Sequence, residues 1–190
     1  MEDQTATTGR ITSLIRRANG GDGAALNDLF ASLYPDLERI AHARLHRHET
    51  ITLLDTVALL HEAYLRLVKA GELNVENRAH FLAYASRTMR SIIVDYARAR
   101  QAERRGSGRK PVELDTVAAD SIADPADDVL RLHEALQQLE TVDERLGRVV
   151  EMRYFGGLSV QEIGAILGVT DRTVRRDWEK ARVLLSIALK

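Results

Sequence analysis

Residues 158–185, with the sequence LSVQEIGAILGVTDRTVRRDWEKARVLL, limit the fold of this chain more than any other segment. Ser159 followed three residues later by Glu162 is the capping-box pattern, which begins a helix by satisfying its free N–H groups. Gly168 then predicts a tight turn, and Thr170 is placed to cap a second helix. The segment therefore predicts two short helices joined as a helix-turn-helix.

The second of these helices has two different faces. Apolar residues recur along it at helical spacing, and we expect these to pack inward: Val174, Trp178, Ala181 and Leu185. The residues left facing outward are Arg172, Thr173, Arg175, Arg176 and Lys180. Arginine can bind guanine edges with two hydrogen bonds, and Lys or Arg can neutralise phosphates. Two packed helices with a solvated basic face would be the simpler interpretation, but the paired caps, the glycine turn and the clustered arginines favour DNA binding.

The rest of the chain also has apolar residues at helical spacing. Aromatic residues are only 5% of the sequence, which favours helices over strands. We expect an all-α fold with helices over 11–18, 24–45, 56–69, 79–104, 129–139, 144–155, 160–167 and 171–189. Pro35 lies inside the second of these ranges, so that helix is expected to kink or break there.

Residues 106–127, GSGRKPVELDTVAADSIADPAD, separate these helices into two groups. The segment is rich in Gly, Ser, Ala, Asp and Pro and has no convincing apolar period, so we interpret it as a flexible linker. The predicted architecture is thus two helical domains, over 10–105 and 128–190.

The net charge of −1 hides a separation of the two signs along the chain. Residues 98–110 are strongly basic, whereas residues 113–128 contain acids and no Lys or Arg. A local basic patch can bind phosphates even when the whole chain is nearly neutral, so the net charge does not exclude a nucleic-acid partner.

Several classes of protein are not indicated. Cysteine is absent, which excludes a disulfide framework and a thiolate metal site. His42, His46 and His48 suggest a metal site, but a third ligand is not indicated and no carboxylate pair completes a catalytic zinc motif, so we expect no metal. No Walker loop, Rossmann glycine pattern or nucleophile elbow occurs, so we expect neither an enzyme nor a cofactor. The polar N-terminus and the lack of a long apolar run predict a cytoplasmic protein with no membrane partner.

With these residues identified, the chain from about residue 10 to its end resembles an extracytoplasmic-function (ECF, group IV) sigma factor of the sigma-70 family. In that family a σ2 domain and a σ4 domain are joined by a flexible linker. The resemblance implies an alternative sigma factor for transcription initiation, which directs core RNA polymerase to promoter DNA. It implies a σ2-like domain over 10–105 and a σ4-like domain over 128–190, whose second short helix binds the −35 element through the five outward residues named above.

Two acids in that helix depart from the basic or neutral residues common in relatives. They are Asp177 and Glu179. We interpret them as pairing within the helix with Lys180 or Arg176.

Residues 80–105, HFLAYASRTMRSIIVDYARARQAERR, resemble σ2 regions 2.3 and 2.4, which open and read the −10 element. Together with the preceding loop, the resemblance implies −10 binding by Asn74, Asn77, Arg78, Tyr84, Arg87, Arg90 and Arg98. Melted DNA requires aromatic surface for stacking and cations for phosphates. Tyr84 replaces a tryptophan common in relatives, and we leave it open between core and surface; we expect Phe81 and Tyr96 in the core.

Residues 53–67, LLDTVALLHEAYLRL, resemble region 2.2, which grips the clamp helices of the polymerase β′ subunit. The resemblance implies polymerase contacts by Asp55, Leu59, Glu62 and Arg66. Relatives usually carry Asp-Ala-Glu-Asp where this chain has Asp-Thr-Val-Ala at 55–58, so two acids are replaced by apolar residues.

Three threonines lie beside this gap: Thr50, Thr52 and Thr56. A phosphate adds about −1.5 to −2 charge at neutral pH, and anions are favoured near a helix N-terminus. We hypothesise that a Ser/Thr kinase activates the factor at one of these sites. The alternative is that the threonines merely cap the helix, and that Glu62 and apolar contacts suffice for polymerase binding.

Two other functions compete with the sigma factor. A dimeric helix-turn-helix regulator of the response-regulator output type would bind a palindrome, but it has no need of the basic helix before the linker. An anti-sigma-like interaction protein has no use for the arginine-rich second helix. An anti-sigma factor is instead a candidate partner, and packing between the two free domains is left open by the sequence.

Overall fold

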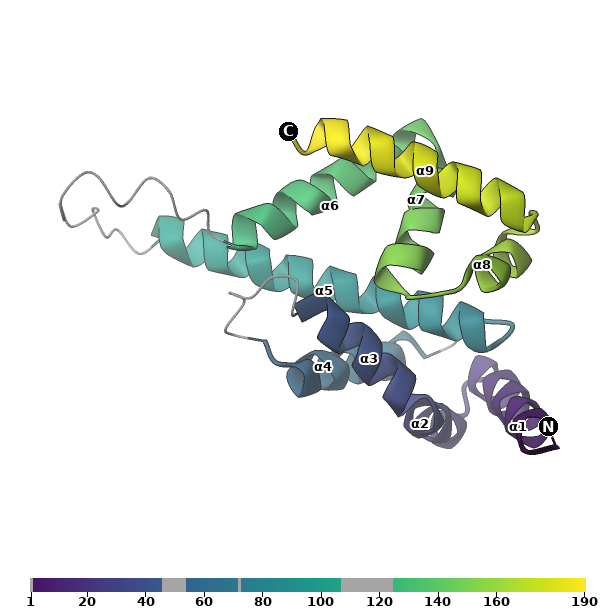
Figure 1. The fold of residues 1–190 in the computed structure, drawn as a ribbon. Helices are drawn as coiled ribbons and strands as arrows, with labels where there is room; N and C mark the ends of the chain where they lie inside the picture. Colours follow the sequence, from purple (N-terminus) through teal and green to yellow (C-terminus); the bar gives the residue numbers. More distant parts are fainter. Residues whose placement is uncertain (1, 46–53, 72, 107–124) are drawn as a thin grey trace, which may run out of the picture.

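The computed structural model describes residues 2–45, 54–71, 73–106 and 125–190 (Figure 1). Every regular element within these ranges is helical, which confirms the predicted all-α fold. The elements are α1 (Glu2–Asn19), α2 (Gly23–Ser32), α3 (Tyr34–Leu45), α4 (Thr56–Ala70), α5 (Arg78–Gly106), α6 (Pro125–Val142), α7 (Glu144–Val150), the π-helical turn η1 (Glu151–Phe155), α8 (Val160–Leu167) and α9 (Asp171–Ala188).

The long helix α5 runs through the middle of the molecule, with the other helices on two sides of it (Figure 1). Helices α3 and α4 contact α5 from one side, and α6, η1 and α8 contact it from the other. Helix α1 packs mainly on α2, which continues the first side. Helix α9 lies at the outer edge of the second side, where it packs on α6, α7 and α8.

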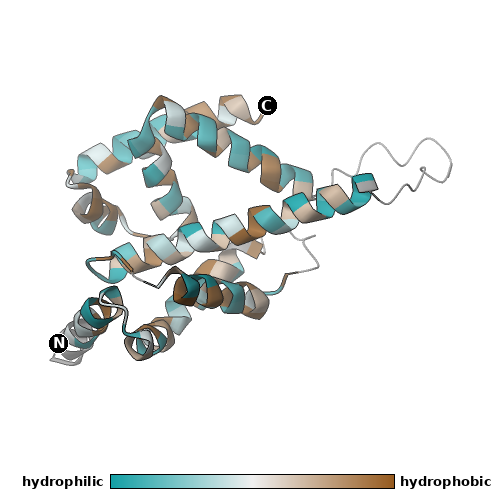
Figure 2. Ribbon diagram, turned by 180° about the vertical axis from the view of Figure 1, so that it is seen from behind, coloured by the Kyte–Doolittle hydropathy of each residue, from teal (hydrophilic) through white to brown (hydrophobic). Residues whose placement is uncertain are grey.

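Buried apolar residues from both halves of the chain form one continuous core. Helix α5 supplies the fully buried Phe81, Met89 and Ile92. Residues of the C-terminal helices belong to the same cluster: Val149, Met152, Ile163 and Val174. In Figure 2 most helices carry both brown and teal residues, as expected for amphipathic helices that bury one face. The C-terminal helices therefore pack onto α5 through apolar burial, and the two halves are in direct contact.

A short second cluster and a close approach hold the C-terminal helices to each other. The cluster is formed by Leu136, Leu139, Leu146, Val150 and Ala181. A Cβ atom at Gly147 would overlap Cγ of Glu140, so α7 can approach α6 this closely because residue 147 has no side chain.

Several element boundaries differ from the sequence-based expectation. The expected helix over 24–45 is broken in two, because α2 ends at Ser32 and α3 begins at Tyr34. Pro35 then lies in the first turn of α3, where its missing N–H group costs no intrahelical hydrogen bond. Helix α6 begins at Pro125, so residues 125–127 of the predicted linker are helical.

Candidate nucleic-acid interface

The helix-turn-helix forms as the capping residues predict. The Ser159 hydroxyl accepts a hydrogen bond from the Glu162 N–H at 3.2 Å, and the Glu162 carboxylate accepts one from the Ser159 N–H at 2.8 Å. Gly168 ends α8 in the left-handed conformation with φ of 65°, which favours glycine. The Thr170 hydroxyl then accepts from the Thr173 N–H at 3.3 Å and caps α9. These three hydrogen bonds and the left-handed glycine determine where α8 begins and ends and where α9 begins.

The turn also needs a second glycine that the sequence analysis did not single out. A Cβ atom at Gly164 would lie 2.8 Å from the carbonyl oxygen of Val169. The chain after α8 therefore packs directly on the backbone of that helix, and a side chain at residue 164 would displace it.

Helix α9 buries the face that the spacing predicted, with one addition. Val174 and Ala181 are fully buried, while Trp178 and Leu185 are half-buried. Asp177 is buried as well, with 2% of its surface exposed. Its carboxylate accepts a hydrogen bond from Nε of Arg145 on α7 at 2.7 Å.

The predicted pairing of the two acids within α9 is confirmed in part, because Asp177 pairs with Arg176 and Glu179 pairs within the helix, but the shortest contact of Asp177 and the partner of Glu179 differ from those expected. The shortest contact of Asp177 is the interhelical one to Arg145, and Arg176 approaches its other carboxylate oxygen at 3.4 Å. Glu179 pairs with Arg182 at 3.4 Å. Lys180 instead lies 3.7 Å from Asp143, the cap of α7. Asp177 thus orients α9 against α7, because its buried charge requires the Arg145 guanidinium.

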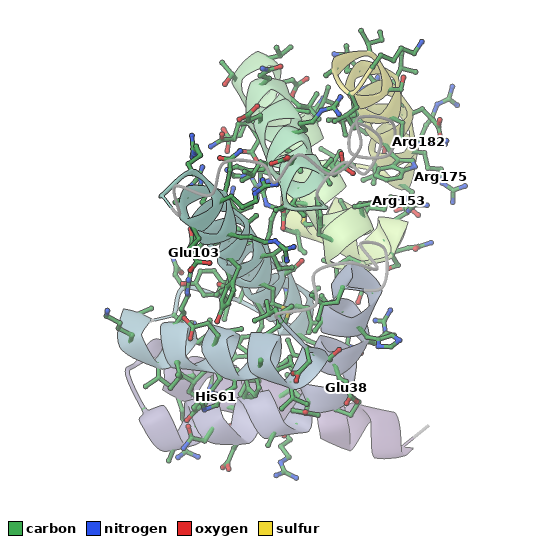
Figure 3. The ribbon with its side chains drawn as sticks, turned by 90° about the vertical axis from the view of Figure 1, so that its left-hand side faces the viewer. Glu38, His61, Glu103, Arg153, Arg175 and Arg182 are labelled. Carbon is green, nitrogen blue, oxygen red and sulfur yellow. The ribbon has the colours of Figure 1, made fainter. Side chains whose placement is uncertain are left out.

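The basic face of α9 points to solvent. Arg172, Arg175 and Arg176 are exposed, and Arg172 and Arg175 form no ion pair with any residue that the structure describes. Figure 3 shows Arg175 and Arg182 projecting away from the body of the molecule. Thr173 is half-buried, and its hydroxyl lies 3.0 Å from that of Thr170. The N-terminal turns of α9 therefore present cations that no acid of the described chain neutralises.

The predicted −10 residues on α5 have a different environment. Arg90 is only 12% exposed in its side chain, and its guanidinium lies 2.8 Å from Glu151 and 3.5 Å from Glu140. Arg78 pairs with Asp36 at 2.6 Å and with Glu162 at 3.4 Å. Three of these four acids belong to the C-terminal helices, so in this arrangement Arg78 and Arg90 are already occupied by carboxylates.

Other predicted −10 residues line a cleft between the two halves. The cleft has a volume of about 280 Å³, and Asn74, Tyr84 and Arg87 face it from one side. Arg148 and Ile166 face it from the C-terminal helices. Tyr84 is 38% exposed, which resolves the open question about this residue in favour of the surface.

The remaining residues of that prediction are distributed differently. Asn77 caps α5, because its side-chain oxygen accepts from the His80 N–H at 3.0 Å. Arg98 is exposed. Phe81 is fully buried, as predicted, but Tyr96 is 42% exposed, so its assignment to the core was wrong.

Helix α4 carries the residues predicted to bind polymerase. Asp55 caps the helix by accepting from the Ala58 N–H at 2.7 Å. Leu59 is fully buried, so it supports the helix from inside and presents no surface to a partner here. Glu62 pairs with Arg66 at 3.3 Å, and Arg66 also lies 2.9 Å from Asp95 on α5.

Exposed apolar residues on α4 escaped the sequence analysis. Val57, Leu65 and Val68 are 63%, 46% and 45% exposed. Val57 also lines a groove of about 410 Å³ between α4 and the end of α2, together with Phe30 and Tyr34. Their helical spacing was visible in the sequence, but the same spacing also fits a buried face.

The candidate phosphorylation sites are partly outside the described residues. Thr50 and Thr52 fall in the segment 46–53, which the structure does not describe. Thr56 is the first residue of α4 and is half-buried. The cap of this helix is Asp55, so for Thr56 the alternative of a capping role is wrong.

No group of three or more His, Asp or Glu residues that could hold a metal ion occurs in the described part of the chain. His46 and His48 lie outside it, and His42 is exposed. Among the described helices, none is long and apolar enough to span a bilayer.

Comparison with known proteins gives the same assignment as the motifs. The family model described as ECF sigma factor matches residues 8–190, nearly the whole chain. No curated protein matches the sequence.

Proposed function

Because the chain belongs to the ECF sigma factor family, we propose which of its surfaces bind core polymerase, the −10 element and the −35 element. As a member of that family it is an alternative sigma factor, a non-catalytic protein whose partners are core RNA polymerase and promoter DNA. We assign polymerase and −10 binding to residues 10–105 and −35 binding to residues 128–190, with the connection between them running from the end of α5 to the start of α6. The family match does not favour a dimeric response-regulator-type function.

The −35 assignment is carried by the exposed cations of α9. A recognition helix places its N-terminal residues in the major groove, and Arg172, Thr173, Arg175 and Arg176 lie in the first turns of α9. The Arg145–Asp177 pair on the opposite face holds the helix in place. Arg172 and Arg175 are the candidates for base contacts, while Arg176 and Lys180 are candidates for phosphate contacts.

The −10 assignment rests on the mixture of groups around the cleft. Tyr84 offers a partly exposed ring for stacking, and Arg87 offers a guanidinium to the backbone of a melted strand. Asn74, Asn77 and Arg78 precede or begin the same helix, and Arg90 and Arg98 continue it. In this assignment, the C-terminal helices have to move before Arg78 and Arg90 can reach DNA.

The polymerase assignment rests on α4. Glu62 supplies an acid, and Val57, Leu65 and Val68 supply exposed apolar surface beside it. Two acids usual in relatives are missing at residues 57 and 58, which leaves the helix N-terminus with less negative charge than in those relatives. We therefore retain phosphorylation of Thr50, Thr52 or Thr56 by a Ser/Thr kinase as part of the proposal. An anti-sigma factor is a further candidate partner.

Binding to core polymerase tests these assignments. Wild type, Thr50→Glu, Thr52→Glu and Thr56→Glu are each compared in co-purification with the cognate core enzyme. Thr141→Glu, on the exposed surface of α6, is the matched control for the added charge. We expect a Glu variant near α4 to bind more tightly than wild type, because the added anion replaces the missing acids near a helix N-terminus.

The outcomes distinguish polymerase binding through α4 from activation by threonine phosphorylation. Tight binding by wild type would make the phosphorylation step unnecessary while supporting the polymerase surface. Binding improved equally by Thr141→Glu would show that the added charge acts non-specifically. Failure of every variant to bind would contradict the proposed polymerase surface.

A further inference from the structure

We propose that carboxylates of the C-terminal helices pair with arginines of α5 in the way that DNA phosphates would. Single-stranded DNA has to displace these carboxylates before it can bind α5. The inference rests on the proposed −10 function of α5. It adds that the closed chain has a covered −10 surface and a free −35 helix, so the two DNA surfaces become available in different states of the protein.

The first observation is that acids from the C-terminal helices contact α5 at three places along its length. Arg78 near its beginning meets Glu162 of α8, and Arg90 in its middle meets Glu140 of α6 and Glu151 of η1. Near its end, Arg104 meets Asp127 of α6 at 2.9 Å. Three arginines spread along α5 are therefore paired with acids from the same half of the chain.

The central contact, between Arg90 and the two acids Glu140 and Glu151, is the most buried of the three, and we call it the latch. The side chains of Arg90 and Glu151 are 12% and 8% exposed, and the Arg90 guanidinium lies 5.9 Å from the centre of the Phe155 ring. A charge held this far from water requires its partner, and removal of one partner from a buried pair is strongly unfavourable. The two ends, where Arg78 and Arg104 are 40% and 44% exposed, contribute less because water screens them.

The chemistry of the contact explains why DNA and the C-terminal helices exclude each other. A guanidinium binds carboxylate and phosphate oxygens with the same N–H donors. Glu151 and Glu140 lie against the guanidinium of Arg90, so a DNA phosphate cannot take the same place while they remain there. The packing of Met152 and Val149 against the core keeps η1 over Arg90. Release of η1 and α6 is thus a condition for DNA binding at Arg90.

The recognition helix is not subject to this restriction. Arg172 and Arg175 are exposed and lack an ion pair among the described residues, whereas Arg78 and Arg90 each have two acids. In this proposal the closed chain can bind duplex DNA through α9, but it cannot bind single-stranded DNA at α5. By linkage, single-stranded DNA has to shift the chain toward an open arrangement to the same extent that opening strengthens its binding.

The test uses the full chain with two spin labels. The protein has no cysteine, so Lys69→Cys on α4 and Ser186→Cys on α9 can be labelled without further changes. The distance between the labels is measured by double electron–electron resonance. The affinity for a fluorescent 20-nucleotide single strand of mixed sequence is measured by anisotropy on the same proteins.

The decisive variant is Glu140→Gln/Glu151→Gln, which leaves Arg90 buried without a carboxylate. Its matched control is Glu38→Gln/Glu144→Gln, which changes the net charge equally at two exposed acids. We expect one short distance in wild type and control, a longer population in the latch variant, and single-strand binding about tenfold tighter than in the control. Addition of the single strand to wild type is expected to produce the same longer population.

Equal distances and equal affinities in the latch variant and its control would overturn the proposal, as would a long distance in unliganded wild type. If Glu140→Gln/Glu151→Gln fails to fold by circular dichroism, Asp127→Asn/Glu162→Gln, which removes the exposed contacts, decides by the same two measurements with a smaller expected shift. Core polymerase binding by the same proteins separates this proposal from the proposed function. If the latch variant opens but the chain does not bind polymerase, the result supports the pairing proposed for α5 and contradicts the proposed function.

Discussion

Helices α5 and α9 are both amphipathic and basic, but their cations lie in different environments. Helix α9 lies at the edge of the molecule (Figure 1), and its Arg172 and Arg175 are exposed to solvent. On α5, Arg90 is enclosed between the two halves of the chain and paired with Glu140 and Glu151. The difference shows that two basic helices of one chain can keep their cations in different states: Arg172 and Arg175 of α9 stay unpaired because no described acid reaches them, whereas Arg90 of α5 is paired within the chain.

The difference arises because α5 is packed against other helices on two sides, whereas α9 is packed on one side. Helix α5 has α3 and α4 on one side and α6, η1 and α8 on the other, so most of its circumference meets protein. Helix α9 packs on α6, α7 and α8 from one side only in Figure 1. Arg90, in the middle of α5, therefore lies between protein on both sides, whereas Arg172 and Arg175 of α9 face water.

The largest effect is expected from the residue that keeps α9 in its exposed position. Arg145→Ala leaves the Asp177 carboxylate buried with Arg176 as its remaining cation, and we expect a loss of about 3 kcal/mol in the free energy of unfolding. Urea denaturation followed by circular dichroism measures this. The control Arg182→Ala breaks the exposed pair with Glu179 and is expected to cost less than about 1 kcal/mol. Equal losses in both variants would show that the buried pair does not hold α9.

The next effect concerns DNA binding by α9 without any effect on stability. Arg175→Ala is expected to weaken binding to a duplex containing the −35 element by about tenfold or more, since a two-hydrogen-bond contact to guanine contributes about 1–3 kcal/mol. The melting temperature should not change, because the side chain forms no ion pair with the described residues. Electrophoretic mobility shift with wild type, Arg175→Ala and the control Arg131→Ala on α6 measures the difference. An equal loss in Arg131→Ala would indicate general electrostatic attraction rather than a surface on α9.

A smaller effect is expected from the cap of α9. Thr170→Ala removes the acceptor for the Thr173 N–H and should lower the free energy of unfolding by about 1 kcal/mol. Thr88→Ala, whose hydroxyl bonds to a carbonyl within α5 and caps nothing, is the matched control. Hydrogen exchange at the first turn of α9 should rise in Thr170→Ala alone; unchanged exchange there would contradict a capping role.

The smallest effect is a dependence on pH at the α5–α6 contact. Burial lowers the pKa of His133 below its ordinary value of 6.5, the charges of Arg90 and Arg98 lower it further, and Glu140 and Glu134 oppose the shift. The unfolded chain therefore binds a proton at a higher pH than the folded chain does, so stability falls as the pH is lowered through about 6.5. Thermal melts from about pH 7.5 to about pH 5.5, roughly one unit on either side of that value, should show a shallower fall in melting temperature for His133→Gln. The exposed His61→Gln is the control, and identical slopes for wild type and His133→Gln would contradict the effect.

The helix-turn-helix is the part of the candidate site that the sequence predicted best. Its capping box, its left-handed glycine and its second cap all form between residues three or four positions apart. The inward and outward faces of α9 follow from the same local spacing, and Asp177 was misjudged because its partner Arg145 is 32 residues away. Tyr96 was misjudged for a related reason, since a helical period does not show how many sides of α5 are covered.

The sequence by itself determined the helices, their caps and the family, because these depend on side chains within one or two turns and on motifs that can be read in order. Only the tertiary structure decided which cations are free. Arg90 and Glu140 are 50 residues apart in the chain, and Arg78 and Glu162 are 84 apart. Pairs at such separations depend on how apolar faces from both halves pack around α5, and that packing has no local signature in the sequence.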